Sequence, residues 1–372
     1  MIDTMGIIIA SNINIPPLTD VRSATALPIA GGYRIIDFVL SNMASAGLEN
    51  IGVATEANYS SLMDHIKSGA PWDLDRKNRG LNILPPNIGN KNSFEIIRGD
   101  LDLLNGIRDF IHRSRETYVI LSLGNNIYNI DFNAVVESHI ERQADITIIY
   151  KDMKDVDQKE LSRYTLLEVD SEQNITDIEV CPYYPKTTLA STDVFVMERV
   201  LLESIVDECS ARGNHDFIKD AIAKKMSGLR MYGYEHEGYT DKIDSMKAYY
   251  NNNMRFLEKE TQEELLHSGK PIYTKNRDLQ PTKYGDEAEV VNSYIADGCV
   301  IEGTVINSVL SGNVVVKKGA VVKNSVLMQS DVINEDVLLE YVVLDKEVEI
   351  TAGKKLIGQE SYPLPVAKGT VI

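Results

Sequence analysis

The chain has 372 residues, of which 43% are hydrophobic and 25% are charged, and its formal net charge is −17 at pH 7. This length is enough to bury a large core and favours two domains over one. A strongly acidic chain repels a phosphate backbone, so we expect no nucleic-acid partner.

The cysteines and the apolar runs predict a cytoplasmic protein. Cys181, Cys209 and Cys299 are odd in number and form neither a CxxC pair nor a zinc-binding spacing, which favours a reducing compartment. No basic segment precedes the short apolar run at the N-terminus, and no apolar stretch approaches the roughly 18–20 residues that span a bilayer. We therefore expect a soluble, cytoplasmic protein without membrane contact.

The first two thirds of the chain alternate between two apolar patterns. Short apolar runs predict buried strands over 6–10, 51–55, 118–123 and 145–150. Apolar residues at helical spacing predict a helix over 131–143, with Asp131 as its N-cap. Strands that alternate with helices predict an α/β domain with a mostly parallel sheet. We expect this domain to cover 1–260.

From about Ala288 onward the apolar residues follow a period of six. The predicted inward-pointing residues are Ile295 and Ile301, six apart, then the six-residue series Val309, Val315, Val321, Leu327, Ile333 and Leu339, followed after a one-residue slip by Leu344, Ile350 and Leu356. This period fits neither an ordinary strand nor a helix and predicts a β-helix, whose coils bury one another's faces. We expect a polar linker over 261–285 and the β-helix over 286–372.

Several blocks, in this order, resemble the glucose-1-phosphate adenylyltransferases (ADP-glucose pyrophosphorylases) of bacteria. The blocks are Gly31–Phe38 (GGYRIIDF), Leu40–Asn42, Pro71–Arg76 (PWDLDR), Leu84–Pro86, Pro185–Ser191 (PKTTLAS), His215–Phe217 and Ile295–Thr304 (IADGCVIEGT). The resemblance runs from about residue 5 to 358. It implies a nucleotide-sugar transferase domain with a Rossmann-like mixed sheet, a left-handed parallel β-helix and a tetramer. The family makes ADP-glucose and pyrophosphate from ATP and glucose 1-phosphate in glycogen biosynthesis.

The loop after the first strand departs from that family. Catalytic members carry a glycine-rich loop with an arginine, whose backbone N–H groups close on phosphate. Residues 11–17 of this chain are Ser-Asn-Ile-Asn-Ile-Pro-Pro. The prolines have no N–H to offer and the isoleucines resist positive φ. A phosphate cradle would survive only if the serine and asparagine side chains replaced the backbone donors.

Two lysines of the family are also missing. Ala24 stands at the lysine of the family's RAKPA motif, here residues 22–26, and Cys181 stands at the lysine of its EKP motif, here residues 180–182. Ser191 keeps a hydroxyl that the resemblance assigns to substrate binding. A serine satisfied locally at a strand end is the alternative interpretation of Ser191.

The metal-binding aspartates of the family are replaced as well. Asn125, within 124–131 (GNNIYNID), stands at the first of them, and Lys242, within 238–244 (GYTDKID), stands at the second. A neutral amide is a poor Mg²⁺ ligand, and a lysine puts a cation where a cation would bind. Asp241 is adjacent, but neighbouring residues of a strand point to opposite faces, so it substitutes only after a register shift.

These losses predict a regulatory, catalytically impaired subunit of ADP-glucose pyrophosphorylase. We expect no catalytic residues and no metal site in this chain, no required cofactor, and Mg²⁺ only in the catalytic partner. The expected partner is a catalytic pyrophosphorylase subunit that this chain stimulates in a heterotetramer, with a homo-oligomer as the alternative for the chain alone.

Three other functions compete with this prediction. The first is a weakly active transferase that uses Asp241 or Asp244 for its metal. The second is a hexapeptide-repeat acyltransferase, which the position of all six histidines before the repeats, ending at His267, disfavours. The third is a sensor that binds a nucleotide or a sugar phosphate without chemistry.

Four cationic residues are candidates for an effector site. Arg34 could contact a nucleotide or sugar-phosphate effector, or it could pair with Asp37 or another carboxylate. Lys317, Lys318 and Lys323 form a basic cluster on the predicted β-helix, for which a solvated corner is the alternative. Four further polar residues lie in matched blocks, and we predict structural roles for them: Tyr128, Asp131, His215 and Tyr239.

Overall fold

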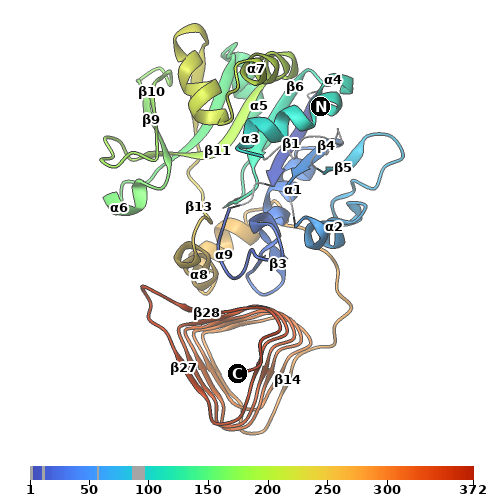
Figure 1. Ribbon diagram of the computed structural model, residues 1–372, viewed down its shortest axis with the longest axis vertical. Coiled ribbons are helices and arrows are strands. Elements are labelled where there is room, and N and C mark those ends of the chain that lie inside the picture. The colour runs from blue at the N-terminus through green and yellow to red at the C-terminus, as the bar shows by residue number, and fades with distance from the viewer. Residues whose placement is uncertain (1–2, 11–12, 57, 86–96) are drawn as a thin grey trace. The chain divides into compact units, whose positions relative to one another are not determined.

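The computed structural model describes residues 3–10, 13–56, 58–85 and 97–372, which form two compact units (Figure 1). The first unit comprises residues 1–11, 38–59 and 66–242, and the second comprises residues 12–37, 60–65 and 243–372. Two N-terminal segments therefore fold with the C-terminal third of the chain. In the described ranges, no helix has the length and apolar content needed to cross a bilayer.

The first unit is built on a mixed sheet, which confirms the predicted α/β fold. Its order is β10-β9-β11-β6-β1-β4-β5, and β8 pairs with both β11 and β12. The neighbours β6, β1, β4 and β5 are parallel, whereas β11 runs antiparallel to β6 and β8. The nine strands found within the described residues are β1 (Thr4–Ala10), β4 (Asn50–Thr55), β5 (Gly80–Leu84), β6 (Tyr118–Leu123), β8 (Ile146–Asp152), β9 (Thr165–Val169), β10 (Ile175–Val180), β11 (Leu189–Glu198) and β12 (Met231–Glu235).

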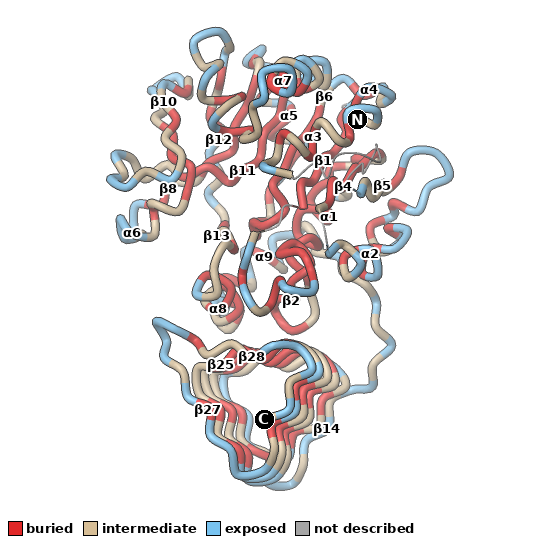
Figure 2. Tube along the Cα trace, viewed as in Figure 1, coloured by how far each residue is buried: buried red, intermediate tan, exposed pale blue. Residues whose placement is uncertain are grey.

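Helices cover this sheet because its central strands are apolar on both faces (Figure 2). Met5, Ile7 and Ile9 of β1 share one buried cluster with apolar residues of α3 and α7. On Gly6 of the same strand a Cβ atom would lie 2.5 Å from the sulfur of Met43 in α1, so this helix packs directly on backbone. Among the described residues, the helices wholly or mostly in the first unit are α1 (Ile35–Ser45), α3 (Asp100–Gly106), α4 (Arg108–Arg113), α5 (Phe132–Glu141), α6 (Gln158–Leu161) and α7 (Arg199–Ala211). The second unit contains α2 (Ser60–Ile66) apart from its last residue, α8 (Met246–Arg255) and α9 (Lys259–Leu266).

The predicted strands of this unit and its predicted helix are present. The four strands correspond to β1, β4, β6 and β8, and the helix corresponds to α5. The Asp131 carboxylate accepts hydrogen bonds from the backbone N–H groups of Asn133 and Ala134, as an N-cap does. Charge and apolar spacing were therefore sufficient to predict these elements.

Residues 283–366 form three parallel sheets of five strands each, stacked as the coils of a β-helix, which confirms the second part of the fold prediction. Figure 1 shows the three-sided coils in orange to red. The first sheet contains β14 (Lys283–Tyr284), β17 (Val300–Ile301), β20 (Val315–Val316), β23 (Val332–Ile333) and β26 (Glu349–Ile350). The second contains β15 (Glu289–Val291), β18 (Thr304–Ile306), β21 (Val321–Lys323), β24 (Leu338–Glu340) and β27 (Lys355–Ile357). The third contains β16 (Tyr294–Ile295), β19 (Val309–Leu310), β22 (Val326–Leu327), β25 (Val342–Leu344) and β28 (Leu364–Val366).

The predicted phase of the repeat is wrong at three positions. The interior cluster contains Leu310, Val316 and Val322, and their preceding neighbours Val309, Val315 and Val321 lie outside it. Adjacent strand residues point to opposite sides, and each pair is apolar at both positions, so composition alone gave no preference. The cause is the coil length: paired residues such as Val316 and Ile333 lie 17 positions apart, one fewer than three steps of six.

Asparagines form one corner of each of three successive coils. Asn292, Asn307 and Asn324 have φ values of 43°, 46° and 46°, in the left-handed region that asparagine tolerates better than most residues. A serine follows each asparagine, and the N–H of Ser325 donates to Oγ of Ser308 at 3.2 Å in the coil below. Asparagine therefore suits this left-handed turn but is not essential to it, because Tyr341 in the next coil, 17 residues after Asn324, has a φ of 52°.

Candidate functional site

A short antiparallel pair of strands brings together two of the substituted positions. β6 ends at Leu123, and after Gly124 and Asn125 the chain forms β7 (Asn126–Tyr128). β13 (Thr240–Lys242) pairs with β7 so that Lys242 lies opposite Asn126. Positions 125 and 242 therefore meet in the first unit, although more than 100 residues separate them in the chain.

The Lys242 side chain is directed to a buried carboxylate. Its Nζ atom lies 3.0 Å from Oδ2 of Asp193, whose side chain is 1% exposed while that of Lys242 is 17% exposed. Asp193 lies within β11, where the pairing with β8 shifts register, and its φ is 55°. Asp193 was not predicted from the sequence. A lone acid inside the apolar run TDVFV was the signal that could have identified it.

Asp241 takes part in a different contact. Its Oδ1 accepts a hydrogen bond of 2.5 Å from the hydroxyl of Tyr164 and a further one from the backbone N–H of Lys242. The side chains of Asp241 and Lys242 thus have different partners, as the alternation along a strand requires. The register shift that would exchange them is not present, because Lys242 pairs with Asn126 and Asp241 with Ile127.

The charges of this ion pair influence the ionisation of another acid, Asp100. Burial, followed by the carboxylates of Asp216, Asp193 and Glu56, raises the pKa of Asp100 to about 6, with an opposing effect of Lys242. These groups lie close enough to influence one another's ionisation. The ammonium of Lys242 is thus a cation among several carboxylates.

Three buried atoms beside the ion pair have no hydrogen-bond partner among the described residues. They are Nδ2 of Asn125, Oδ1 of Asn126 and Oδ1 of Asp193. Asn126 is fixed by its other amide atom, which donates to the Thr192 carbonyl at 2.5 Å. A Mg²⁺ ion does not fit this arrangement, because the Asp193 carboxylate already holds an ammonium and Asn125 offers a neutral amide. Within the described ranges, no group of three or more acidic, histidine or cysteine side chains is arranged to hold a metal.

The side chains of Ser191 and Cys181 form hydrogen bonds with backbone groups of the first unit. The Ser191 hydroxyl accepts a hydrogen bond of 3.0 Å from the backbone N–H of Asp193, so it supports the irregular stretch of β11. Cys181 is exposed, with a φ of 49°, and its thiol donates to the Arg163 carbonyl at 3.5 Å. The role of Ser191 in substrate binding stays a prediction.

Three of the polar residues in the matched blocks have structural contacts. Tyr128 is fully buried and exchanges a hydrogen bond of 2.7 Å with Ser122, and burial raises the pKa of its phenol. Nδ1 of His215 lies 3.0 Å from the Asp102 carboxylate. Asp131 caps α5.

Ala24 and the described part of the proline-containing loop, residues 13–17, lie in the second unit. Ala24 is part of a one-turn helix over Ala24–Ala26 and is completely buried. Ser11 and Asn12 lie outside the described residues, as does Pro86 of the matched blocks. In the rest of the loop, the backbone N–H of Ile15 donates to Oγ1 of Thr19 at 2.8 Å. One of the loop's backbone N–H groups is thus already bonded to a side chain just after the loop.

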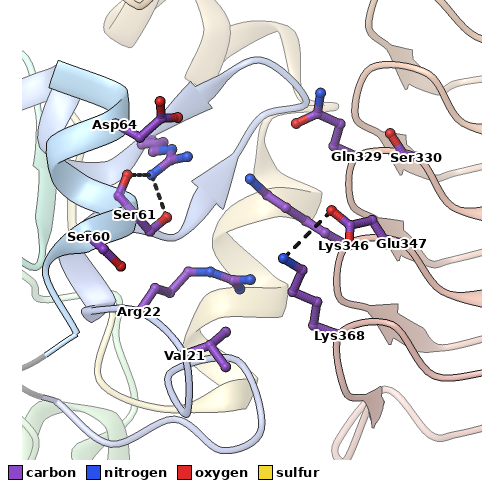
Figure 3. Close-up of a pocket in the computed structure, with 11 residues that line it drawn as sticks. Val21, Arg22, Ser60, Ser61, Asp64, Gln329, Ser330, Lys346, Glu347 and Lys368 are labelled. Carbon is purple, nitrogen blue, oxygen red and sulfur yellow. Dashed lines mark hydrogen bonds and ion pairs between the residues drawn. The ribbon is translucent and has the colours of Figure 1, made fainter. Parts of the chain in front are cut away.

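The second unit contains a basic cavity of about 410 Å³. Figure 3 shows Arg22, Lys346 and Lys368 extending into the same space from different segments. Arg34 also lines it and donates from Nη1 to the Ser61 carbonyl at 2.7 Å and to the Ser61 hydroxyl at 3.0 Å. The remaining lining residues are Val21, Ser60, Asp64, Gln329, Ser330 and Glu347.

Positive charge exceeds negative charge in this cavity. Burial lowers the pKa of Lys346 to about 7, with further contributions from Arg34, Arg22 and Arg277. Burial likewise lowers the pKa of Arg34 to about 10, and Nε of Arg34 is buried without a hydrogen-bond partner in the described part of the chain. A small anion in the cavity would relieve this mutual repulsion.

The predicted lysine cluster does not line the cavity. Lys317 lies 3.4 Å from Glu335, and Lys318 lies 2.8 Å from Glu287, so both are engaged in surface ion pairs. Lys323 ends β21, where it pairs with Ile306 and Glu340. Of the four predicted effector residues, the structure places Arg34 alone in the cavity. The effector role of the three lysines stays a prediction.

Comparison with known proteins yields two family models and a set of close relatives. Residues 14–259 match the model of the nucleotidyl transferases, and residues 279–362 match the GlmU-like C-terminal hexapeptide model. A glycogen biosynthesis protein, GlgD, of Bacillus subtilis is 34% identical over 286 residues, which cover 76% of this chain and 71% of the relative. Glucose-1-phosphate adenylyltransferases of Halalkalibacterium halodurans and Thermosipho melanesiensis are each 33% identical, over 76% of this chain and over 74% and 68% of their own lengths.

Proposed function

Because the chain belongs to the glucose-1-phosphate adenylyltransferase family, we propose that it is a regulatory, catalytically impaired subunit of this enzyme. It would stimulate a catalytic subunit in a heterotetramer that converts ATP and glucose 1-phosphate to ADP-glucose and pyrophosphate. The names of its relatives, a glycogen biosynthesis protein and two glucose-1-phosphate adenylyltransferases, support a place in glycogen biosynthesis.

The observation that carries this proposal is the ion pair between Lys242 and Asp193. Adenylyl transfer joins two polyanions, so it depends on cations that neutralise the reacting phosphates. In this chain the cation beside the β7–β13 pair is a lysine, and its charge is already matched by a buried carboxylate at 3.0 Å. Mg²⁺ would then be needed in the catalytic partner and not in this chain.

The basic cavity of the second unit supports the regulatory part of the proposal. It gathers Arg22, Arg34, Lys346 and Lys368 in a protein whose net charge is −17. A nucleotide or sugar-phosphate effector would balance the excess of positive over negative side chains that line the cavity. Such a ligand would adjust the activity of the mixed oligomer through this chain.

The test is an assay of ADP-glucose synthesis by the purified full-length chain, first alone and then with a catalytic homologue. We expect background activity from the chain alone and a higher rate from the mixture than from the catalytic subunit by itself. Robust Mg²⁺-dependent synthesis by the lone chain would overturn the proposal and favour the weakly active transferase.

A second arm tests the cavity in the same mixture. Arg34→Gln in this chain should reduce the response of the mixture to sugar-phosphate effectors, whereas Lys317→Gln should leave it unchanged. Arg34 lines the cavity and Lys317 pairs with Glu335 outside it. Equal losses from both variants would show that the cavity is not the regulatory site.

A further inference from the structure

Lys346 is a half-buried lysine of the basic cavity, and Figure 3 shows its side chain extending into the open space. Among the described residues, its Nζ atom takes part in no ion pair or hydrogen bond. Carboxylates in and beside the cavity already pair with other cations: Asp345 with Arg22 at 2.8 Å, Glu347 with Lys368 at 3.6 Å and Asp64 with Lys275 at 3.1 Å. The Nζ atom of Lys346 therefore faces a cavity without a carboxylate of its own.

An amine in this position is a better nucleophile than the amine of a surface lysine. Loss of water and neighbouring cations both disfavour the ammonium form, and these are the conditions that activate nucleophilic lysines in enzymes. Burial is the larger cause here and lowers the pKa of Lys346 to about 7, so amine and ammonium are both populated near neutral pH. Lys346 thus has an available electron pair under conditions in which a surface lysine is almost entirely protonated.

The cavity also contains a hydrogen-bond donor that is not used. Arg34 lines the cavity and is 4% exposed, and its buried Nε–H group has no acceptor in the described part of the chain, although its Nη1 atom donates to Ser61. A buried guanidinium N–H without an acceptor is destabilising, and an anionic oxygen is the strongest acceptor for it. A negative group on Lys346 would share the cavity with the cations of Arg22, Arg34 and Lys368.

We propose that Lys346 is a site for carbon dioxide, at which its uncharged Nζ amine forms a reversible carbamate. The amine electron pair bonds to the carbon of CO₂, one C=O π pair moves onto oxygen, and a proton leaves Nζ for solvent. Dissolved carbon dioxide is the co-reactant, and no oxidant or reductant is needed. The reaction turns a cationic position into an anionic one, which the other cations of the cavity stabilise. The proposal goes beyond the proposed function, because the carbamate forms whether or not the chain pairs with a catalytic subunit.

The experiment incubates the full-length chain with ¹³C-labelled bicarbonate at pH 8. The carbamate is detected by NMR, trapped as an ethyl ester with triethyloxonium and assigned by peptide mass spectrometry, which also separates it from the carbamate of the α-amino group. We expect a yield on Lys346 about tenfold or more above that on Lys317, a 37% exposed lysine paired with Glu335. The yield on Lys346 should fall as the pH is lowered through about 7, because protonation removes the electron pair. No trapped carbamate on Lys346, or equal yields on the two lysines, would overturn the proposal.

Variants and a competing anion test whether the cavity stabilises the carbamate. Lys346→Arg keeps a positive charge and should lose the adduct, because a guanidinium offers no amine. Arg34→Gln should lower the yield on Lys346 several-fold, whereas Lys317→Gln should not change it. If Arg34→Gln does not fold, Lys368→Gln takes its place, with an expected loss of about twofold. Saturating sulfate should suppress the carbamate. An unchanged yield in the cavity variant, or a yield that survives sulfate, contradicts the proposal, and none of these measurements depends on ADP-glucose synthesis.

Discussion

Lys242 in the first unit and Lys346 in the second are both partly buried lysines, but their neighbours differ in sign. Lys242 lies 3.0 Å from Asp193, with further carboxylates nearby. Lys346 is close to Arg22, Arg34 and Arg277, and burial and these cations together lower its pKa to about 7. The first lysine is paired with a carboxylate, whereas the second lies in a cavity whose lining has more positive than negative side chains.

This difference separates two ways in which a protein can handle buried charge. When a buried charge already has an oppositely charged partner, binding of a further ion adds little favourable electrostatic free energy. Cations that repel one another destabilise the empty site, and a bound anion lowers the electrostatic free energy by reducing this repulsion. Under the proposed function, the first unit is the region where a lysine takes the place of a metal ion, and the second is the region where ligand control is to be sought.

The largest expected effect comes from removing the buried acid of the basic region. Asp345→Asn should lower the free energy of unfolding by about 3 kcal/mol, because it leaves the Arg22 guanidinium, 3% exposed, without its carboxylate at 2.8 Å. Urea unfolding measures the change. Glu347→Gln is the control, since Glu347 is 60% exposed and 3.6 Å from Lys368, and it should cost less than about 0.5 kcal/mol. Equal costs would mean that Arg22 needs no buried partner.

The next effect is the pH dependence of anion binding in the basic cavity. Sulfate keeps its charge between pH 6 and 8, whereas Lys346, with a pKa of about 7, loses its proton as the pH rises through that range. Sulfate affinity should therefore fall about tenfold from pH 6 to pH 8, with proton uptake on binding. Calorimetry in buffers of different ionisation enthalpy measures both quantities. Lys346→Arg should remove the pH dependence, and a dependence that survives in this variant would assign it to another group.

The same pKa predicts the opposite trend for the stability of the free protein. In the unfolded chain a lysine keeps a pKa near 10.4, so between about pH 7 and pH 10 the unfolded state binds more protons than the folded state. In the absence of sulfate, the contribution of Lys346 should therefore make the free energy of unfolding rise with pH across this window. Sulfate should reduce that rise, because it favours the protonated lysine in the folded protein.

A smaller effect is expected from the exposed rim of the cavity. Lys368→Gln should weaken sulfate binding about two- to threefold, because exposed charges are well screened by water. Lys317→Gln is a matched control: the Lys317 side chain is 37% exposed and that of Lys368 is 41% exposed, but Lys317 pairs with Glu335 outside the cavity. Titration with sulfate at low ionic strength compares the two. A larger loss from Lys317→Gln would move the anion site to the predicted lysine cluster.

No effect is expected when the two metal positions are made acidic again. Asn125→Asp combined with Lys242→Asp should leave the lone chain at background ADP-glucose synthesis even if Mg²⁺ binds. The reason is the proline-containing loop, where the Ile15 N–H already donates to Thr19 and the two prolines offer no donor to phosphate. Substantial activity in this double variant would show that the blocked metal site alone accounts for the loss of catalysis.

Local patterns in the sequence predicted the elements of this protein well. The apolar runs at 6–10 and 118–123 became β1 and β6, and Asp131 became the cap of α5, because these structures depend on residues close in the chain. The six-residue period predicted the β-helix for the same reason. It gave the wrong phase at Val309, Val315 and Val321, since both members of each apolar pair were equally acceptable inside.

The candidate sites were only partly predictable. The substituted positions Asn125 and Lys242 were identified by resemblance, and β7 and β13 do bring them together. Their partner Asp193 was missed, because nothing within a few residues of it indicates Lys242. Arg34 was a predicted effector residue, but its companions in the cavity, such as Lys346, were not, and they are distant in sequence.

By itself, the sequence determined that this chain forms an α/β domain and a β-helix, and its resemblance to the family predicted which loop and side chains are replaced. Those features follow from backbone geometry and residue type, which act over a few neighbouring positions. Only the tertiary structure decided that Lys242 is neutralised by Asp193 while Arg22, Arg34 and Lys346 share a cavity. Charge interactions depend on distance in space, which the fold sets and the order of residues does not reveal.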